Sequence, residues 1–130
     1  MSLAQVLSKG ADIWLNTPVP EREACGTSGM KACLNGVLNL TTNGGWVAEV
    51  KHQNIGWVLS EENLATQIYA TLKDEIIPLF FDRPKGIPVG WVEKMKVAVS
   101  EIEKNYSAKR MLDDYVSKLY FPTNLDKPEL

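Results

Sequence analysis

The short stretch Gly26-Thr27-Ser28-Gly29 constrains the fold of this chain more than any other feature, because it lies between two kinds of secondary structure. Before it, residues 12–16 form a brief apolar run that predicts a buried strand. After it, residues 28–35 predict a helix and residues 37–41 a second strand. A strand, a helix and a strand joined by short connections indicate an α/β domain with a parallel sheet.

The rest of the chain predicts further strands and helices around this unit. We expect the end of a helix at 4–9, strands at 46–50 and 56–59, and helices at 61–76, 89–104 and 107–120. Ser60 and Asn63 are the predicted cap of the helix at 61–76, which Pro78 disturbs. About four strands, with the chain opening almost directly into one, predict part of a doubly wound, Rossmann-like parallel sheet with flanking helices.

The composition is that of an ordinary globular protein. A length of 130 residues predicts one domain, and a net charge of −2 provides no basic field for nucleic acid or an anionic membrane. The chain has no signal peptide and no run of about 20 apolar residues, so we expect a soluble cytoplasmic protein. Cys25 and Cys33 are eight positions apart without neighbouring ligand residues, which predicts free thiols and no metal site.

The residues around the small-residue turn are suited to binding an anion and a sugar. Backbone N–H groups at a helix start favour an anion, and Thr27 and Ser28 add hydroxyl donors. Lys31 could form a Schiff base there, and the Glu23 carboxylate could accept hydrogen bonds from sugar hydroxyls. The alternative interpretation is a turn without a ligand, a solvated surface lysine and a surface carboxylate.

The stretch Glu23 to Lys31 closely resembles that of the α-glucan (glycogen/maltodextrin) phosphorylases. Its flanks at 11–18 and 35–40 share the resemblance, as do Ile76 to Arg83, Trp91 to Lys96 and the segment from Tyr106 to Tyr120. The resemblance covers about residues 3–122. It implies that residues 1–122 are the latter part of the C-terminal, cofactor-binding domain of a two-domain, glycosyltransferase B-type fold. From their polar sequence, we expect residues 123–130 to form a disordered tail.

The resemblance also assigns a cofactor. It implies that Lys31 carries pyridoxal phosphate as an imine, and that Thr27 and the backbone of Ser28 hold the cofactor phosphate. That phosphate would relay a proton to orthophosphate while a glucosyl unit is transferred from α-1,4-glucan to give glucose 1-phosphate.

The glucosyl hydroxyls would be held by Glu23 and by the backbone of Cys25 and Gly26. Two departures from the family pattern stand out. Cys25 occupies a position where serine is common, and residues 43–48 differ from the Asp-Gly-Trp-Trp pattern of many relatives, which leaves the role of that loop open.

A chain of this length lacks the rest of a phosphorylase site, because the family's phosphate-binding basic residues and sugar-contacting histidine lie upstream of this segment. We therefore expect a C-terminal fragment that is inactive alone, contains no confident catalytic residue, and exposes apolar surface that favours self-association. One alternative is a non-catalytic sugar- or phosphate-binding module, or one subunit of a split enzyme. A nucleotide-sugar glucosyltransferase fragment is the third; such enzymes usually have a second glutamate eight positions after the first, where this chain has Lys31.

Overall fold

The core of the protein is a three-stranded parallel sheet of order β1-β2-β3. The structure is a computed structural model that describes residues 3–120. The strands are β1 (Ile13–Asn16), β2 (Leu38–Thr42) and β3 (Gly56–Leu59). In the register of the sheet, Leu15 pairs with Leu40, and Leu40 pairs with Trp57. The parallel sheet with flanking helices confirms the predicted α/β class and its partial, Rossmann-like character. The predicted tail at 123–130 lies outside the described residues.

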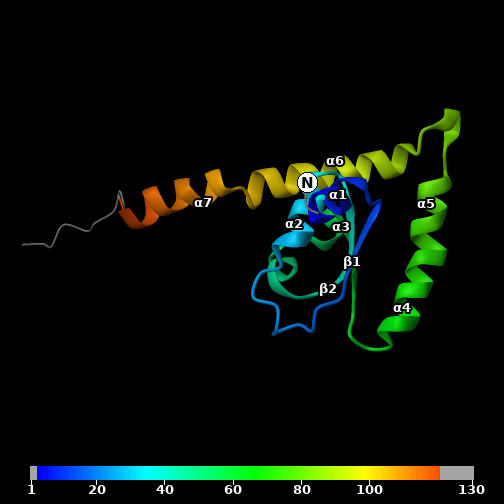
Figure 1. The fold of residues 1–130 in the computed structure, drawn as a ribbon, viewed down its shortest axis with the longest axis horizontal. Helices are drawn as coiled ribbons and strands as arrows, with labels where there is room; N and C mark the ends of the chain where they lie inside the picture. Colours follow the sequence, from blue (N-terminus) through cyan, green and yellow to red (C-terminus); the bar gives the residue numbers. More distant parts are fainter. Residues whose placement is uncertain (1–2, 121–130) are drawn as a thin grey trace, which may run out of the picture.

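Helices surround this sheet and lengthen the molecule (Figure 1). The α-helices are α1 (Leu3–Gly10), α2 (Thr27–Leu34), α3 (His52–Ile55), α4 (Leu64–Thr71), α5 (Ile77–Phe81), α6 (Val89–Asn105) and α7 (Ala108–Tyr115). Shorter segments are the 3-10 helices η1 (Gly45–Glu49) and η3 (Pro84–Gly86) and the π-helical segments η2 (Leu72–Ile76) and η4 (Val116–Tyr120). Figure 1 shows α6 and α7 along the top as a rod, and α4 and α5 as a column at one side.

The two faces of the sheet are covered by different helices, because successive side chains of a strand point to opposite faces. On one face the buried side chain of Asn39 bonds to residues of α2. On the other face the indole Nε1 of Trp57 donates to Glu75 of η2 at 2.9 Å, and its ring centroid lies 6.0 Å from that of Trp91 in α6. All five residues of β2 are buried, so this central strand is the axis of the core.

The strand predicted at 46–50 is wrong, and the described residues contain three strands rather than about four. Residues 45–49 instead form the 3-10 helix η1, in which the Val47 N–H donates to the Gly44 carbonyl. The Trp46 N–H donates to the carbonyl of Cys25 rather than to a neighbouring strand. The backbone of Gly45 has a φ of 56°, a left-handed conformation that interrupts any extended segment.

The helix predicted at 61–76 is displaced and longer than expected. It begins at Leu64, and α4, η2 and α5 run on without interruption to Phe81. Asn63 is the N-cap residue, as predicted, but its side chain makes no capping hydrogen bond. Pro78 does disturb the helix as predicted: its ring excludes the usual i to i−4 bond, and a π-helical turn immediately before it absorbs the misfit.

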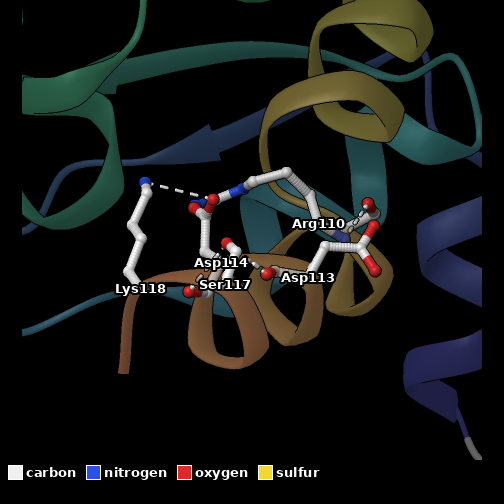
Figure 2. Close-up of polar contacts among 6 residues, drawn as sticks. Arg110, Asp113, Asp114, Ser117 and Lys118 are labelled. Carbon is white, nitrogen blue, oxygen red and sulfur yellow. Dashed lines mark hydrogen bonds and ion pairs between the residues drawn. The ribbon is translucent and has the colours of Figure 1, made fainter. Parts of the chain in front are cut away.

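The C-terminal rod is held together by its own local contacts. Ser107 caps α7 by accepting from the Arg110 N–H at 3.2 Å, and Arg110 and Lys118 both pair with Asp114 (Figure 2). Arg110 and then Lys118 hold the pKa of the Asp114 carboxyl below its usual range. Large apolar side chains nevertheless remain exposed along the rod: Met111, Leu112, Tyr115, Val116, Leu119 and Tyr120. Among residues 3–120, no helix combines the length and apolarity needed to cross a bilayer.

Candidate functional site

The predicted site residues lie where the first two strands end. β1 and β2 are parallel, so the loops that follow them leave the same edge of the sheet, which is where α/β proteins bind ligands. Two hydrogen bonds join these loops. The Thr42 hydroxyl donates to the carbonyl of Pro18, and the Trp46 N–H donates to that of Cys25 at 3.0 Å.

The first turn of α2 presents open backbone donors at this edge. Gly26 is its N-cap residue and has φ 84° and ψ 57°, a left-handed conformation that glycine adopts without strain. Glycine has no side chain that could accept a bond from the first N–H groups of the helix, and no capping bond is made. These N–H groups and the helix dipole therefore favour an anion at the start of α2.

The three residues predicted to hold the cofactor lie together. Thr27, Ser28 and Lys31 line one cavity of about 420 Å³ between α1 and α2, a volume within the usual range for small-ligand pockets. All three are exposed, on the side of α2 away from the buried Ala32 and Cys33. The other wall of the cavity comes from Ala4, Gln5, Ser8 and Trp14.

Sequence reasoning missed that second wall. Trp46, Trp57 and Trp91 are buried, whereas Trp14 is half-buried and lines the cavity. The prediction of a helix before β1 was correct, but nothing in its sequence indicates that it lies beside α2.

The three residues predicted to hold the sugar, Glu23, Cys25 and Gly26, form the turn that leads into α2. The Glu23 carboxylate folds back over the turn, so that a Cβ atom at Gly26 would be 2.5 Å from Glu23 Oε1. Cys25 is exposed between them. The lining of the cavity described above includes none of these three residues. The cavity is thus lined by the hydroxyls and the amine, and the Glu23 carboxylate lies outside its lining.

A buried amide holds α2 against the sheet. Asn39 of β2 donates from Nδ2 to the Gly29 carbonyl at 3.2 Å and to the Cys33 Sγ at 2.8 Å. Burial raises the pKa of the Cys33 thiol to about 12, and the bond from Asn39 acts in the opposite direction. Asn39 was not predicted; its only signal is a polar residue between two leucines, Leu38 and Leu40.

The groups around the cavity fit a phosphorylated aldehyde. The open N–H groups of α2 and the hydroxyls of Thr27 and Ser28 are hydrogen-bond donors that suit a phosphate. The Lys31 amine can condense with an aldehyde, and it lines the same cavity. A ligand with both functions would therefore meet both of its complementary groups here.

Comparison with known proteins gives several relatives. The chain is 42% identical over 127 residues to a glycogen phosphorylase of Aquifex aeolicus, a match that covers 91% of the chain. It is 37% identical over 131 residues to a maltodextrin phosphorylase of Thermococcus litoralis, with 92% of the chain covered. A glycogen phosphorylase of Mycobacterium tuberculosis is 38% identical over 134 residues, with 94% covered.

The matched part of each relative is small. The chain spans 18% of the Aquifex protein, 15% of the Thermococcus protein and 16% of the Mycobacterium protein. No protein-family profile matches the chain, and no solved structure gives a significant match.

Proposed function

Because this chain is homologous over about nine-tenths of its length to a C-terminal segment of the glycogen and maltodextrin phosphorylases, we propose that it contributes the cofactor-binding part of an α-glucan phosphorylase site. The reaction of such a site is phosphorolysis of α-1,4-glucan to glucose 1-phosphate, in the cytoplasm. The site is completed by the longer part of the enzyme, to which the small matched fraction of each relative points.

Lys31, Thr27 and Ser28 hold pyridoxal phosphate in this proposal. The Lys31 amine binds the aldehyde covalently, while the Thr27 hydroxyl and the first N–H groups of α2 bind the phosphate. When bound, the cofactor supplies a phosphate group that passes a proton to and from the substrate orthophosphate. The helix dipole favours the charged form of a phosphate at this position, and the walls from α1 and Trp14 limit its contact with water.

Glu23, Cys25 and Gly26 orient the glucosyl unit. The Glu23 carboxylate can accept from two hydroxyls at once, and backbone groups of Cys25 and Gly26 add further polar contacts. A backbone contact does not depend on the side chain, so cysteine at position 25, where serine is common in the family, is compatible with the role.

One observation supports the proposal most directly: Lys31, Thr27 and Ser28 line a common cavity at the start of an uncapped helix. A chain could keep this sequence similarity and still have lost the local geometry of the site. In the described residues an amine and an uncapped helix start meet at one cavity, which supports the proposal.

The test is incubation of the chain with pyridoxal 5′-phosphate, followed by borohydride reduction and peptide mapping. We expect label at Lys31 at least about tenfold faster than at exposed lysines such as Lys73 and Lys85, because the helix start binds the phosphate before the amine reacts. Excess orthophosphate should lower labelling at Lys31 and leave the other lysines unchanged.

Two variants serve as controls. Lys31→Arg keeps the positive charge but cannot form the covalent bond, so specific labelling should disappear while the fold is retained. Thr27→Ala should weaken the preference for this site without abolishing it. Equal labelling of Lys31 and the surface lysines would contradict the proposed cofactor site, and tight binding of ADP-glucose or UDP-glucose would favour a glucosyltransferase fragment instead.

A further inference from the structure

The loop at 43–46 follows β2 and contributes no residue to the proposed cofactor or sugar contacts. It lies directly against the turn that carries Glu23 and Gly26. A Cβ atom at Gly44 would lie 3.5 Å from Pro20 Cα and 3.7 Å from Glu23 Cβ. Gly44 therefore lies against the segment that leads into the Glu23 turn. The Trp46 N–H bonds to the Cys25 carbonyl in the same turn.

Gly45 makes the closest approach of the loop to the site. A Cβ atom there would lie 2.3 Å from the carbonyl oxygen of Cys25 and 3.0 Å from Cγ of Glu23. The first of these atoms belongs to the backbone, which cannot move aside as the end of a flexible side chain can. The φ of 56° at Gly45 is a second reason why only glycine is well tolerated.

The next residue extends the contact to the cofactor half of the site. The indole of Trp46 packs on Gly29 in α2, where a Cβ atom would lie 3.3 Å from two atoms of the ring. One short loop therefore touches the Glu23 turn through Gly45 and the helix that carries Lys31 through Trp46.

We propose that Gly45 is a positioning residue of the site, which fixes the Glu23–Gly26 turn relative to the start of α2. This inference rests on the proposed function for its ligands, but its structural content is independent of them. Without this close approach the hydrogen bond from the Trp46 N–H to the Cys25 carbonyl would be lost. The Glu23 carboxylate and the first N–H groups of α2 would then both shift.

The chain offers two matched controls for Gly45→Ala. Gly86→Ala has the same kind of strain, with a φ of 84°, but nothing lies within 4 Å of its Cβ position. Gly44→Ala is adjacent to Gly45 and meets only ordinary contacts. Comparing the three variants separates displacement of the turn from backbone strain and from a general effect on the loop.

The experiment combines hydrogen exchange of backbone amides with labelling by pyridoxal 5′-phosphate and borohydride. We expect Gly45→Ala to raise exchange at the Trp46 amide at least about tenfold, and to lower the preference for Lys31 at least about tenfold. Both controls should stay within about twofold of the wild type. A Gly45→Ala protein indistinguishable from Gly86→Ala in both readouts would overturn the inference.

Two further outcomes are also decisive. If the wild-type chain shows no preference for Lys31, the proposed cofactor site fails, and the exchange data alone decide whether Gly45 positions the turn. If Gly45→Ala does not fold, hydrogen exchange of the wild-type chain still tests the inference. A wild-type Trp46 amide that exchanges as fast as in an unstructured peptide would show that the loop does not hold the turn.

Discussion

Because the Cys33 thiol is buried, the free energy of unfolding of this chain should fall at alkaline pH, by an amount that follows from the pKa of the thiol. Burial raises its pKa from 9.0 to about 12, although the bond from Asn39 acts in the opposite direction. Above pH 9 the unfolded chain releases the thiol proton and the folded chain retains it, so stability falls as the pH rises from about 9 towards 12. At pH 10 these two pKa values correspond to a loss of about 1.4 kcal/mol.

Urea unfolding of the wild type and of Cys33→Ala, each at pH 8 and pH 10, measures this loss. Other groups also titrate, including Tyr106, whose pKa is raised by burial and then by Glu49 and Glu101, but they do so equally in both proteins. We therefore expect the free energy of unfolding to fall by about 1.4 kcal/mol more in the wild type.

Cys25→Ala is the matched control, because it removes an exposed thiol and should keep the wild-type pH dependence. Equal losses in the wild type and Cys33→Ala would refute the reasoning. They would mean that Cys33 is not shielded in the folded chain, and hence that α2, which carries Lys31, is not packed on β2 as the structure shows.

Two further predictions concern the sheet and the C-terminal rod. Gly56→Ala should lower the free energy of unfolding by roughly 3 kcal/mol or more, since its φ is 139° and a Cβ atom would lie against the Asn39 carbonyl oxygen at 2.0 Å. Gly10→Ala, with nothing within 4 Å, should have little effect in the same urea titration. Ser107→Ala should destabilise α7 by about 1 kcal/mol through loss of the cap on the Arg110 N–H, which the loss of helical circular dichroism on heating would report.

Local signals predicted most of the secondary structure correctly. The helix at 89–104 was expected from its apolar spacing and is observed at Val89–Asn105. The segment at 46–50 was misjudged because tryptophan and valine favour strands. The buried residues there are Trp46, Val47 and Val50, with exposed residues between them. That spacing matches a helical turn better than the alternation of a strand.

The site was predictable only in part, for a physical reason. The motif places Thr27, Ser28 and Lys31 on one side of a helix, so their proximity follows from helical periodicity alone. The contacts of Asn39 with α2 and of Gly45 with the Glu23 turn join different elements of the fold. They depend on how β2 lies beside β1, which no local pattern specifies.

The position of Gly26 explains how so short a motif could bind the two ligands that we propose. The chain must reverse direction there to begin α2, which requires a left-handed backbone and leaves the first N–H groups of the helix uncapped. The same absence of a side chain lets the Glu23 carboxylate fold against the turn. A carboxylate and a phosphate would repel each other if they shared one pocket. In the proposed site the Glu23 carboxylate lies outside the cavity lined by Thr27, Ser28 and Lys31, and the positive end of the helix dipole would favour both anions. Both proposed roles therefore depend on the absence of a side chain at Gly26.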